Sequence, residues 1–364
     1  MSVDRSAESS DGRRDLVVIG ASAGGVEVLT RVARDLPADL RAAVCIVLHI
    51  SPGSPSMLAH ILGRAGTLPC RAARDGERLR EGLILVAPPD HHLVIEDGHV
   101  RLTVGPRENG HRPAIDVLFR SAAEALDSRV IGVILSGTRD DGSAGLAVIK
   151  ASGGATIVQD PEEALYGGMP TSAIANVAVD AIVKSDLVAS TIVSMVKGEN
   201  PSPGAPSETP DPKPPAPEPN PARGASSGSK LPRGPLEGEP VSAICPECGG
   251  VLSERPAAGV VQWECRVGHR YSRDTLLEAQ ADSVESALWA AVRALNDRAI
   301  LLGRMAEQGE KRGQMRSARR FRRQSDAASE QAQIVLQAFA GAARTTLRRV
   351  VDDEEDGVGE EGAA

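Results

Sequence analysis

The stretch DLVVIGASAGG, residues 15–25, decides the fold of this 364-residue chain. Its continuous apolar run is typical of a strand that is buried on both faces of a parallel sheet. A glycine-rich turn and a helical pattern follow, and Ser22 lies at the centre of the turn. Such a turn either holds a phosphate at the helix amino terminus or presents a nucleophile, so other parts of the sequence must distinguish the two.

The phosphate alternative requires features that this turn lacks. A dinucleotide-binding loop has glycine at its first, third and sixth positions, because the backbone must approach a pyrophosphate closely. Between Gly20 and Gly25 the third position is Ser22. The second strand of such a unit should also end near an acid that binds ribose, but here it ends at His49. A nucleotide-binding domain is therefore the weaker alternative.

The nucleophile alternative uses three residues that follow different strand-like runs. Ser22 follows the first run, His49 ends the second, and Asp140 and Asp141 follow VIGVILSG. Because the carboxyl ends of parallel strands meet at one edge of a sheet, we expect these side chains to lie close together. A serine nucleophile needs a base, and the base needs a third group that fixes its tautomer. The helix after Ser22 points its first N–H groups at the same edge, and Gly24 allows close backbone approach to an oxyanion.

Each residue also has an ordinary structural interpretation. Serine at a helix start is usually a cap, and an Asp-Gly pair is usually a turn. A histidine at a strand end is more often a hydrogen-bonded polar residue than a base. The coincidence of all three at the strand ends of one sheet favours catalysis over three separate structural roles.

Strand-like and helical patterns alternate from residue 15 to residue 197. This alternation predicts an α/β fold, with a doubly wound, mostly parallel sheet and helices on both faces. Asp97-Gly98 separates two alternating runs and predicts a small antiparallel hairpin. Residues 1–14 are polar and predicted to be disordered. A Pro-rich stretch, residues 198–241, is interpreted as a linker without a fold of its own.

Beyond the linker the sequence predicts a small metal-binding module and helices. Cys245-x2-Cys248 and Cys265-x3-His269 form two pairs with the spacing of a tetrahedral zinc site, so residues 242–273 are interpreted as a zinc knuckle. Four protein ligands leave no open position, so the zinc is expected to be structural rather than catalytic. The alternative is three ordinary cysteines near a surface histidine.

The last part of the chain reads as a helical hairpin, residues 274–342, followed by an acidic tail, residues 343–364. Apolar residues with nearly heptad spacing suggest pairing of helices within the hairpin or between subunits. The region is therefore a candidate for self-association or for docking of a partner. The basic run 311–323 is interpreted as a solvated helix face neutralised by the acidic tail, and binding to nucleic acid or to an acidic membrane surface is the alternative.

Composition limits the functional classes. The net charge is −8, so no overall basic field attracts nucleic acid, and no nucleic-acid partner is expected. The longest apolar runs, such as AAVCIVL, are too short to span a bilayer, so no membrane insertion is expected. The start of the chain lacks the apolar core of a signal peptide, and five cysteines favour reduced thiols. We therefore predict a cytoplasmic protein.

Six motifs between residues 15 and 197 resemble the catalytic domain of the chemotaxis protein-glutamate methylesterases, the CheB type. They occur in the family's order and at its spacing, and they span about half the chain. The matching motifs are IGASAGG (19–25), VLHIS (47–51), APPDHH (87–92), GPRENGHRPAIDVLF (105–119), ILSGTRDDGSAGL (134–146) and YGGMP (166–170).

The resemblance implies hydrolysis of glutamate methyl esters on chemoreceptor signalling helices, and related enzymes also deamidate receptor glutamines. It implies that Ser22 attacks the ester, that His49 is the base, and that Asp141 orients the histidine. Asp140 falls on a non-catalytic neighbour of Asp141. No cofactor for catalysis is implied, and methylated chemoreceptor-type proteins are the expected partners.

Several positions depart from the family's pattern. Members often carry threonine where this chain has Ala23, and a GMG-type turn where it has Gly137-Thr138-Arg139. These positions lie near the expected oxyanion site, so Ala23, Gly24 and Thr138 are the candidate oxyanion or substrate-binding residues. Well-known members also place a receiver domain before the catalytic domain. We expect no receiver domain before the catalytic domain here, because only 14 residues precede Asp15.

The sequence thus predicts a serine carboxylic ester hydrolase with a Ser22–His49–Asp141 triad. Two alternatives from other classes stay open at this point. One is a catalytically silent signalling scaffold with an esterase fold, and the other is the nucleotide-binding domain described above.

Overall fold

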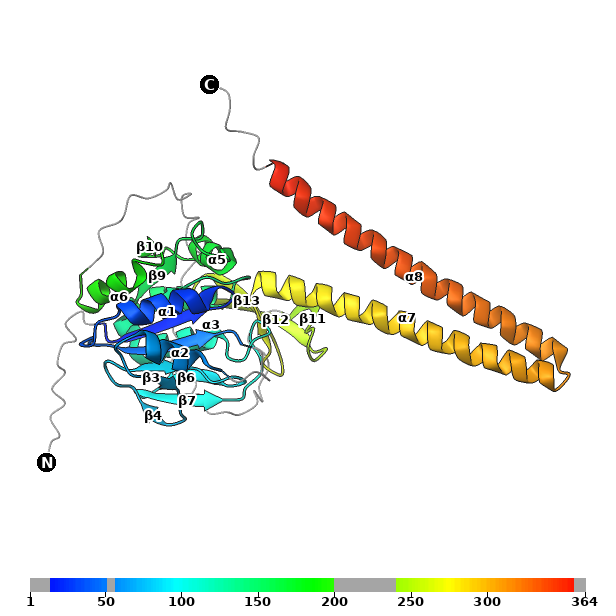
Figure 1. Ribbon diagram of the computed structural model, residues 1–364, viewed down its shortest axis with the longest axis horizontal. Helices are drawn as coiled ribbons and strands as arrows, with labels where there is room; N and C mark the ends of the chain where they lie inside the picture. Colours follow the sequence, from blue (N-terminus) through cyan, green and yellow to red (C-terminus); the bar gives the residue numbers. More distant parts are fainter. Residues whose placement is uncertain (1–13, 51–55, 200–239, 357–364) are drawn as a thin grey trace, which may run out of the picture. The chain divides into compact units, whose positions relative to one another are not determined.

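The computed structural model describes three stretches of the chain, residues 14–50, 56–199 and 240–356. The predicted disordered start and the Pro-rich linker lie almost wholly outside these stretches. The chain divides into two compact units, Met1–Leu277 and Glu278–Ala364. The first unit contains both the parallel sheet and the Cys/His segment, and the second consists of helices (Figure 1).

A seven-stranded sheet forms the centre of the first unit, and every neighbouring pair in it is parallel. Its order is β10 (Ala181–Val183), β9 (Ala155–Gln159), β8 (Val130–Ile134), β1 (Leu16–Ala21), β2 (Ala43–Leu48), β5 (Ile84–Val86) and β3 (Cys70–Ala72). All residues of β1 and β2 are buried, which is the physical reason for their continuous apolar sequences. The chain order changes direction at β1, the position where ligands bind in doubly wound sheets.

Helices cover both faces of this sheet, as predicted (Figure 1). One face packs against α1 (Gly25–Asp35), α2 (Leu58–Ala65) and α6 (Val188–Val196). The other packs against α3 (Ile115–Leu126), α4 (Ser143–Ala151) and α5 (Gly168–Asn176). Side chains of β1 alternate between the two layers, with Val17 and Ile19 in the first and Leu16 and Val18 in the second.

The predicted hairpin is present and has one additional strand. Its strands are β4 (Glu77–Arg78), β7 (His99–Thr103) and β6 (His92–Glu96), paired antiparallel in that order. Asp97 and Gly98 have φ angles of 49° and 73°, the left-handed backbone of a two-residue hairpin turn. The short strands β3 and β4 were not predicted, because runs of two or three partly exposed residues show no clear alternation.

A four-stranded antiparallel sheet carries the Cys/His pairs, in the segment that the sequence predicted as a zinc knuckle. Its strands, in spatial order, are β11 (Pro240–Ile244), β12 (Val251–Ala257), β13 (Val260–Cys265) and β14 (Arg270–Tyr271). Few apolar side chains are buried here, and the largest of them are Leu252 and Tyr271. This sheet belongs to the same compact unit as the parallel sheet.

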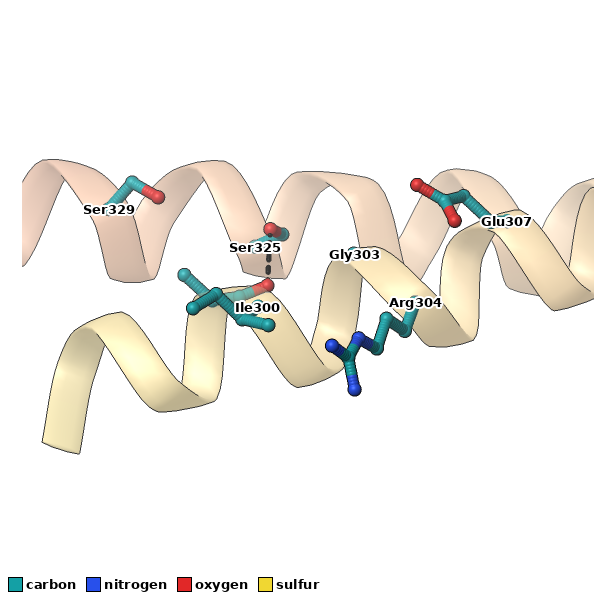
Figure 2. A pocket seen from close by; sticks show the side chains of 7 residues that line it. Ile300, Gly303, Arg304, Glu307, Ser325 and Ser329 are labelled. Atoms are coloured by element: carbon teal, nitrogen blue, oxygen red, sulfur yellow. Dashed lines mark hydrogen bonds between the residues drawn. The ribbon is translucent and has the colours of Figure 1, made fainter.

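Two long helices, α7 (Arg273–Lys311) and α8 (Met315–Asp356), confirm the predicted helical region. Small residues face each other where the helices pack, and the Ser325 hydroxyl donates to the Ala299 carbonyl at 2.7 Å (Figure 2). Ala299, Gly303 and Ser325 line a shallow groove between the two helices. Within the described residues, none of the helices combines the length and apolar character needed to cross a membrane.

Candidate active site

Ser22, His49 and Asp141 meet at the carboxyl ends of β1, β2 and β8. The Nδ1 atom of His49 lies 3.2 Å from the Ser22 hydroxyl oxygen, and its Nε2 atom lies 2.7 Å from a carboxylate oxygen of Asp141. The His49 side chain is 5% exposed and that of Asp141 is 2% exposed. The three residues chosen from the sequence therefore form one continuous hydrogen-bonded chain.

The partners of His49 determine where its proton lies. An ionised carboxylate only accepts hydrogen bonds, so Nε2 carries the hydrogen that faces Asp141. Nδ1 is then the atom with a free electron pair, and it faces the Ser22 hydroxyl. In the chymotrypsin-type triad the ring is turned the other way, with Nε2 facing the serine. Both orientations give a neutral imidazole that can take the serine proton.

Backbone pairing continues past the strand ends and fixes Ser22. The Ser22 amide donates to the Ser136 carbonyl at 2.9 Å, and the His49 amide donates to the Ala21 carbonyl at 3.1 Å. Position 137 must be glycine, because a Cβ atom there would lie 2.9 Å from the Cβ of Ser22. Gly24 has a φ angle of 73° and ends the turn in the left-handed region. Ser22 is thus placed by the ends of three adjacent strands.

The Asp141 carboxylate accepts four hydrogen bonds. Besides His49, its donors are the Ile115 amide at 2.8 Å, the Asn109 side-chain amide at 2.8 Å and the Asp116 amide at 3.2 Å. Burial alone would raise the pKa of Asp141, but the pKa is lowered overall, with the hydrogen bonds from His49 and the Ile115 N–H among the causes. Two of these donors belong to the first turn of α3, where the helix dipole favours negative charge. Asp141 is therefore ionised at neutral pH.

Asp116 connects α3 to the loop that carries Asp141. The sequence suggested only a residue in the first turn of a helix, and the structure places it fully buried with four donors. Those donors are the amides of Gly142 and Gly145 and the side chains of Asn109 and Gln262. Burial and the charge of Asp141 raise the pKa of Asp116 to about 7, against the opposing effect of Arg120.

Two residues near the triad were missed by sequence reasoning. The ring of His111 stacks on that of His49, with centroids 3.6 Å apart and 12° between the planes. Burial and the neighbouring His49 lower the pKa of His111 to about 3, so it is neutral at pH 7. Asn109 donates one hydrogen bond each to Asp116 and Asp141. Both lie in GPRENGHRPAIDVLF (105–119), a motif that was matched without assigning roles to either residue.

Asp140, which the sequence placed beside Asp141, has its hydrogen-bond partners at the start of α7. Its carboxylate accepts from the Thr275 hydroxyl at 2.6 Å and from the Asp274 amide at 3.1 Å. These bonds cap the first turn of α7. The adjacent carboxylates Asp140 and Asp141 thus have separate partners.

The candidate oxyanion donors lie beside Ser22. The amides of Ala23, Gly24 and Thr138 take part in none of the hydrogen bonds formed among the described residues. Ser136 stabilises the turn after β1, because its hydroxyl donates to the Ala23 carbonyl at 2.8 Å. Ala23 and Gly24 directly follow Ser22, and Thr138 follows Gly137, which lies against the Ser22 side chain.

The four predicted metal ligands also come together. Their ligand atoms all lie within 4.8 Å of one another, in the order Cys245, Cys248, Cys265 and His269. Individual separations are 3.5 Å between the sulfurs of Cys248 and Cys265, and 3.7 Å between the Cys245 sulfur and Nδ1 of His269. Zinc–sulfur bonds of about 2.3 Å in a tetrahedron place sulfurs about 3.8 Å apart, so the cluster fits this geometry. The other ring nitrogen of His269 lies 3.2 Å from a Glu247 carboxylate oxygen, a common second partner of a zinc-binding histidine.

Comparison with known proteins identifies relatives of the first part of the chain. Residues 17–192 match the family model described as CheB methylesterase. A relative from Leptospira interrogans, provisionally named protein-glutamate methylesterase/protein-glutamine glutaminase, is 37% identical over 182 residues, which are 50% of this chain and 94% of the relative. Protein-glutamate methylesterase/protein-glutamine glutaminase 2 of Anaeromyxobacter dehalogenans is 41% identical over 174 residues, 48% of this chain and 51% of that protein. The crystal structure of the Thermotoga maritima CheB methylesterase catalytic domain aligns with 33% identity and a TM-score of 0.48, covering 50% of this chain and 98% of that one.

Proposed function

The chain belongs to the CheB methylesterase family of carboxylic ester hydrolases, and from this premise we propose that it demethylates glutamate methyl esters on chemoreceptor-type signalling proteins through Ser22, His49 and Asp141. The observation that supports this proposal most strongly is the hydrogen-bonded chain from the Ser22 hydroxyl through His49 to Asp141. A serine that only caps a helix needs neither a base nor an orienting carboxylate.

The reaction proceeds in two halves. Ser22 attacks the ester carbonyl while Nδ1 of His49 takes the hydroxyl proton, and the Asp141 carboxylate stabilises the resulting imidazolium. The amides of Ala23, Gly24 and Thr138 donate to the oxyanion of the tetrahedral intermediate. His49 then gives its proton to the departing methanol, which leaves the glutamyl group esterified to Ser22. Water, activated by His49, hydrolyses this intermediate and releases a free glutamate side chain.

Deamidation of glutamine is a second reaction of the same site. Attack on a primary amide gives the same acyl intermediate and releases ammonia instead of methanol. The names of the relatives carry both activities. A harder leaving group makes proton donation by His49 more important for the amide than for the ester.

Two other classes of function are less well supported. A silent scaffold has no need for a base aligned on a serine, and a carboxylate with four donors aligned on that base. A nucleotide-binding domain needs an open glycine loop, whereas here the Ser22 side chain occupies the turn beside Gly137.

Methanol release from a methylated receptor fragment tests the proposal. The full chain should release methanol from the methylated fragment and none from the same fragment before methylation. His49→Gln should reduce the rate about 10³-fold, because the serine loses its base. A folded wild-type protein that releases no methanol from the methylated fragment would refute the proposed activity.

We also propose that Cys245, Cys248, Cys265 and His269 hold one structural zinc ion. The support is the tetrahedral spacing of their ligand atoms and the carboxylate partner of His269. Metal analysis should find one zinc per chain, and Cys248→Ser should lose it. Three freely reactive thiols in a folded, metal-free protein would contradict the proposal.

A further inference from the structure

Asn109 connects the candidate active site to the small sheet. Its side-chain nitrogen donates to Asp141 at 2.8 Å and to Asp116 at 3.0 Å. Its side-chain oxygen accepts from the Ser272 amide at 2.7 Å and from the Ser272 hydroxyl at 2.9 Å. Asn109 is fully buried, and these four bonds use the full hydrogen-bonding capacity of its side-chain amide. Two of them go to the carboxylates of Asp141 and Asp116, and two come from Ser272.

The backbone around Asn109 is held by the same segment. The Asn109 amide donates to the Arg270 carbonyl at 2.7 Å, and Glu108 forms an isolated bridge with Arg270. Asn109 has a φ angle of 52°, in the left-handed region, so its conformation depends on such partners. His111, two residues later, stacks on the catalytic base. The edge at β14 thus supports the loop that contacts both His49 and Asp141.

A second connection enters from β13. Gln262 is 1% exposed, and its side-chain amide donates to Asp116 at 3.0 Å. Asp116 in turn accepts the amides of Gly142 and Gly145, which follow Asp141 at the start of α4. Loss of the Gln262 donor leaves a buried carboxylate with one fewer partner.

Two of the proposed metal ligands, Cys265 and His269, lie between Gln262 and Ser272 in the sequence. Gln262 lies three residues before Cys265, and Ser272 lies three residues after His269. The Cys265 amide donates to the His269 carbonyl at 3.0 Å and closes the turn between β13 and β14. An ion bound by Cys265 and His269 would therefore fix the end of β13, which carries Gln262, and the turn before β14, which Ser272 directly follows.

Building on the proposed esterase function, we propose that the small sheet is part of the active site: Ser272 and Gln262 are positioning residues that align Asp141 through Asn109 and Asp116, and zinc in the Cys/His cluster maintains that alignment. Neither residue touches substrate. Their effect is on the orientation of the Asp141–His49 pair, so it should be seen in kcat rather than in KM.

Steady-state methanol release tests the positioning role in the full chain. Gln262→Leu, Ser272→Ala and zinc-stripped wild type should each lose about 10-fold in kcat, since small misplacements of a catalytic group are costly, with KM within about twofold. Ser272→Thr keeps the hydroxyl and should restore most of the rate. Val261→Thr, on the same strand with an exposed side chain, is the matched control and should match wild type.

A double-mutant cycle identifies the route. Ser272→Ala should have almost no further effect in an Asn109→Ala background, because its connection to Asp141 is already lost. Fully additive losses in the two variants would contradict transmission through Asn109.

A spectroscopic readout separates this inference from the esterase proposal. The proton between His49 Nε2 and Asp141 should give a low-field ¹H NMR signal that Asp141→Asn abolishes. Zinc removal and Gln262→Leu should shift or broaden it, and Val261→Thr should not. This result would support the positioning role even in a protein that releases no methanol. An unchanged signal, together with unchanged kcat after zinc loss, would overturn the inference.

Discussion

The proposed triad and the Cys/His cluster lie in one compact unit, but they are held together by different means. The triad is placed by the ends of three parallel strands within a sheet that has a large apolar layer on each face. The cluster lies in a four-stranded sheet with few buried apolar side chains. Hydrophobic burial therefore fixes the first site, whereas side-chain ligands must fix the second. Sites of the first kind keep their geometry without a ligand, and sites of the second kind depend on one.

The largest effect is expected at the triad. Asp141→Asn should lower kcat by about 10³- to 10⁴-fold while leaving the fold intact, because an amide no longer fixes the tautomer of His49. The measurement is methanol release, with circular dichroism as the check on folding. Asp97→Asn is the matched control, because asparagine tolerates the left-handed turn of the exposed hairpin. A loss below about tenfold in Asp141→Asn would contradict the role of the carboxylate.

The second effect, on the local stability of the backbone, should be confined to the small sheet. In Cys248→Ser, amide hydrogen exchange in β12 and β13 should accelerate by at least about 10-fold, because the small sheet lacks a core of its own. Exchange in β1 and β2 should stay as slow as in the wild type. Equal acceleration in both sheets would contradict this, because it would show that the parallel sheet depends on the Cys/His cluster as much as the small sheet does.

The third effect concerns the buried carboxyl group of Asp116. The pKa of Asp116 is raised to about 7, so between about pH 4 and pH 7 the unfolded chain has released this proton while the folded chain still holds it. The wild-type free energy of unfolding therefore falls with rising pH in this window, by up to about 1.4 kcal/mol per pH unit from this group. Asp116→Asn should remove that contribution. The difference in free energy of unfolding between the variant and the wild type should therefore shift in favour of the variant as the pH rises from 4 to 7. Denaturant unfolding at several pH values measures this, and parallel curves would contradict it.

The smallest effect is expected in the helices, where exposed charges contribute little. Arg322 and Glu310 form an ion pair at 3.1 Å, with side chains 46% and 47% exposed. Arg322→Ala should lower the free energy of unfolding of this unit by less than about 0.5 kcal/mol. Ala306→Leu offers the contrast, because it forces a larger side chain into a fully buried position. Thermal unfolding that ranks the two variants in the opposite order would contradict this packing.

The sequence predicted that Ser22, His49 and Asp141 would meet, because each of them follows a strand that can be recognised from its apolar run. The clustering of the three cysteines and His269 was equally predictable, because their spacing is local. Asn109 and His111 were not, since they lie in an irregular loop whose path depends on distant partners. The bond between Asp116 and Gln262 joins residues 146 positions apart, and no local pattern predicts such a contact. The pairing of β11 to β14 was missed because a few partly exposed residues show no period.

The most direct test of the account is the role of Ser22 as the nucleophile. Methanol release from a methylated receptor fragment should be measured for the full-length wild type and for Ser22→Ala at equal concentration, with matched circular dichroism spectra. The account predicts a fall in kcat of about 10³-fold or more in the variant, because no other described hydroxyl is aligned on His49. Equal methanol release by the two proteins would contradict it.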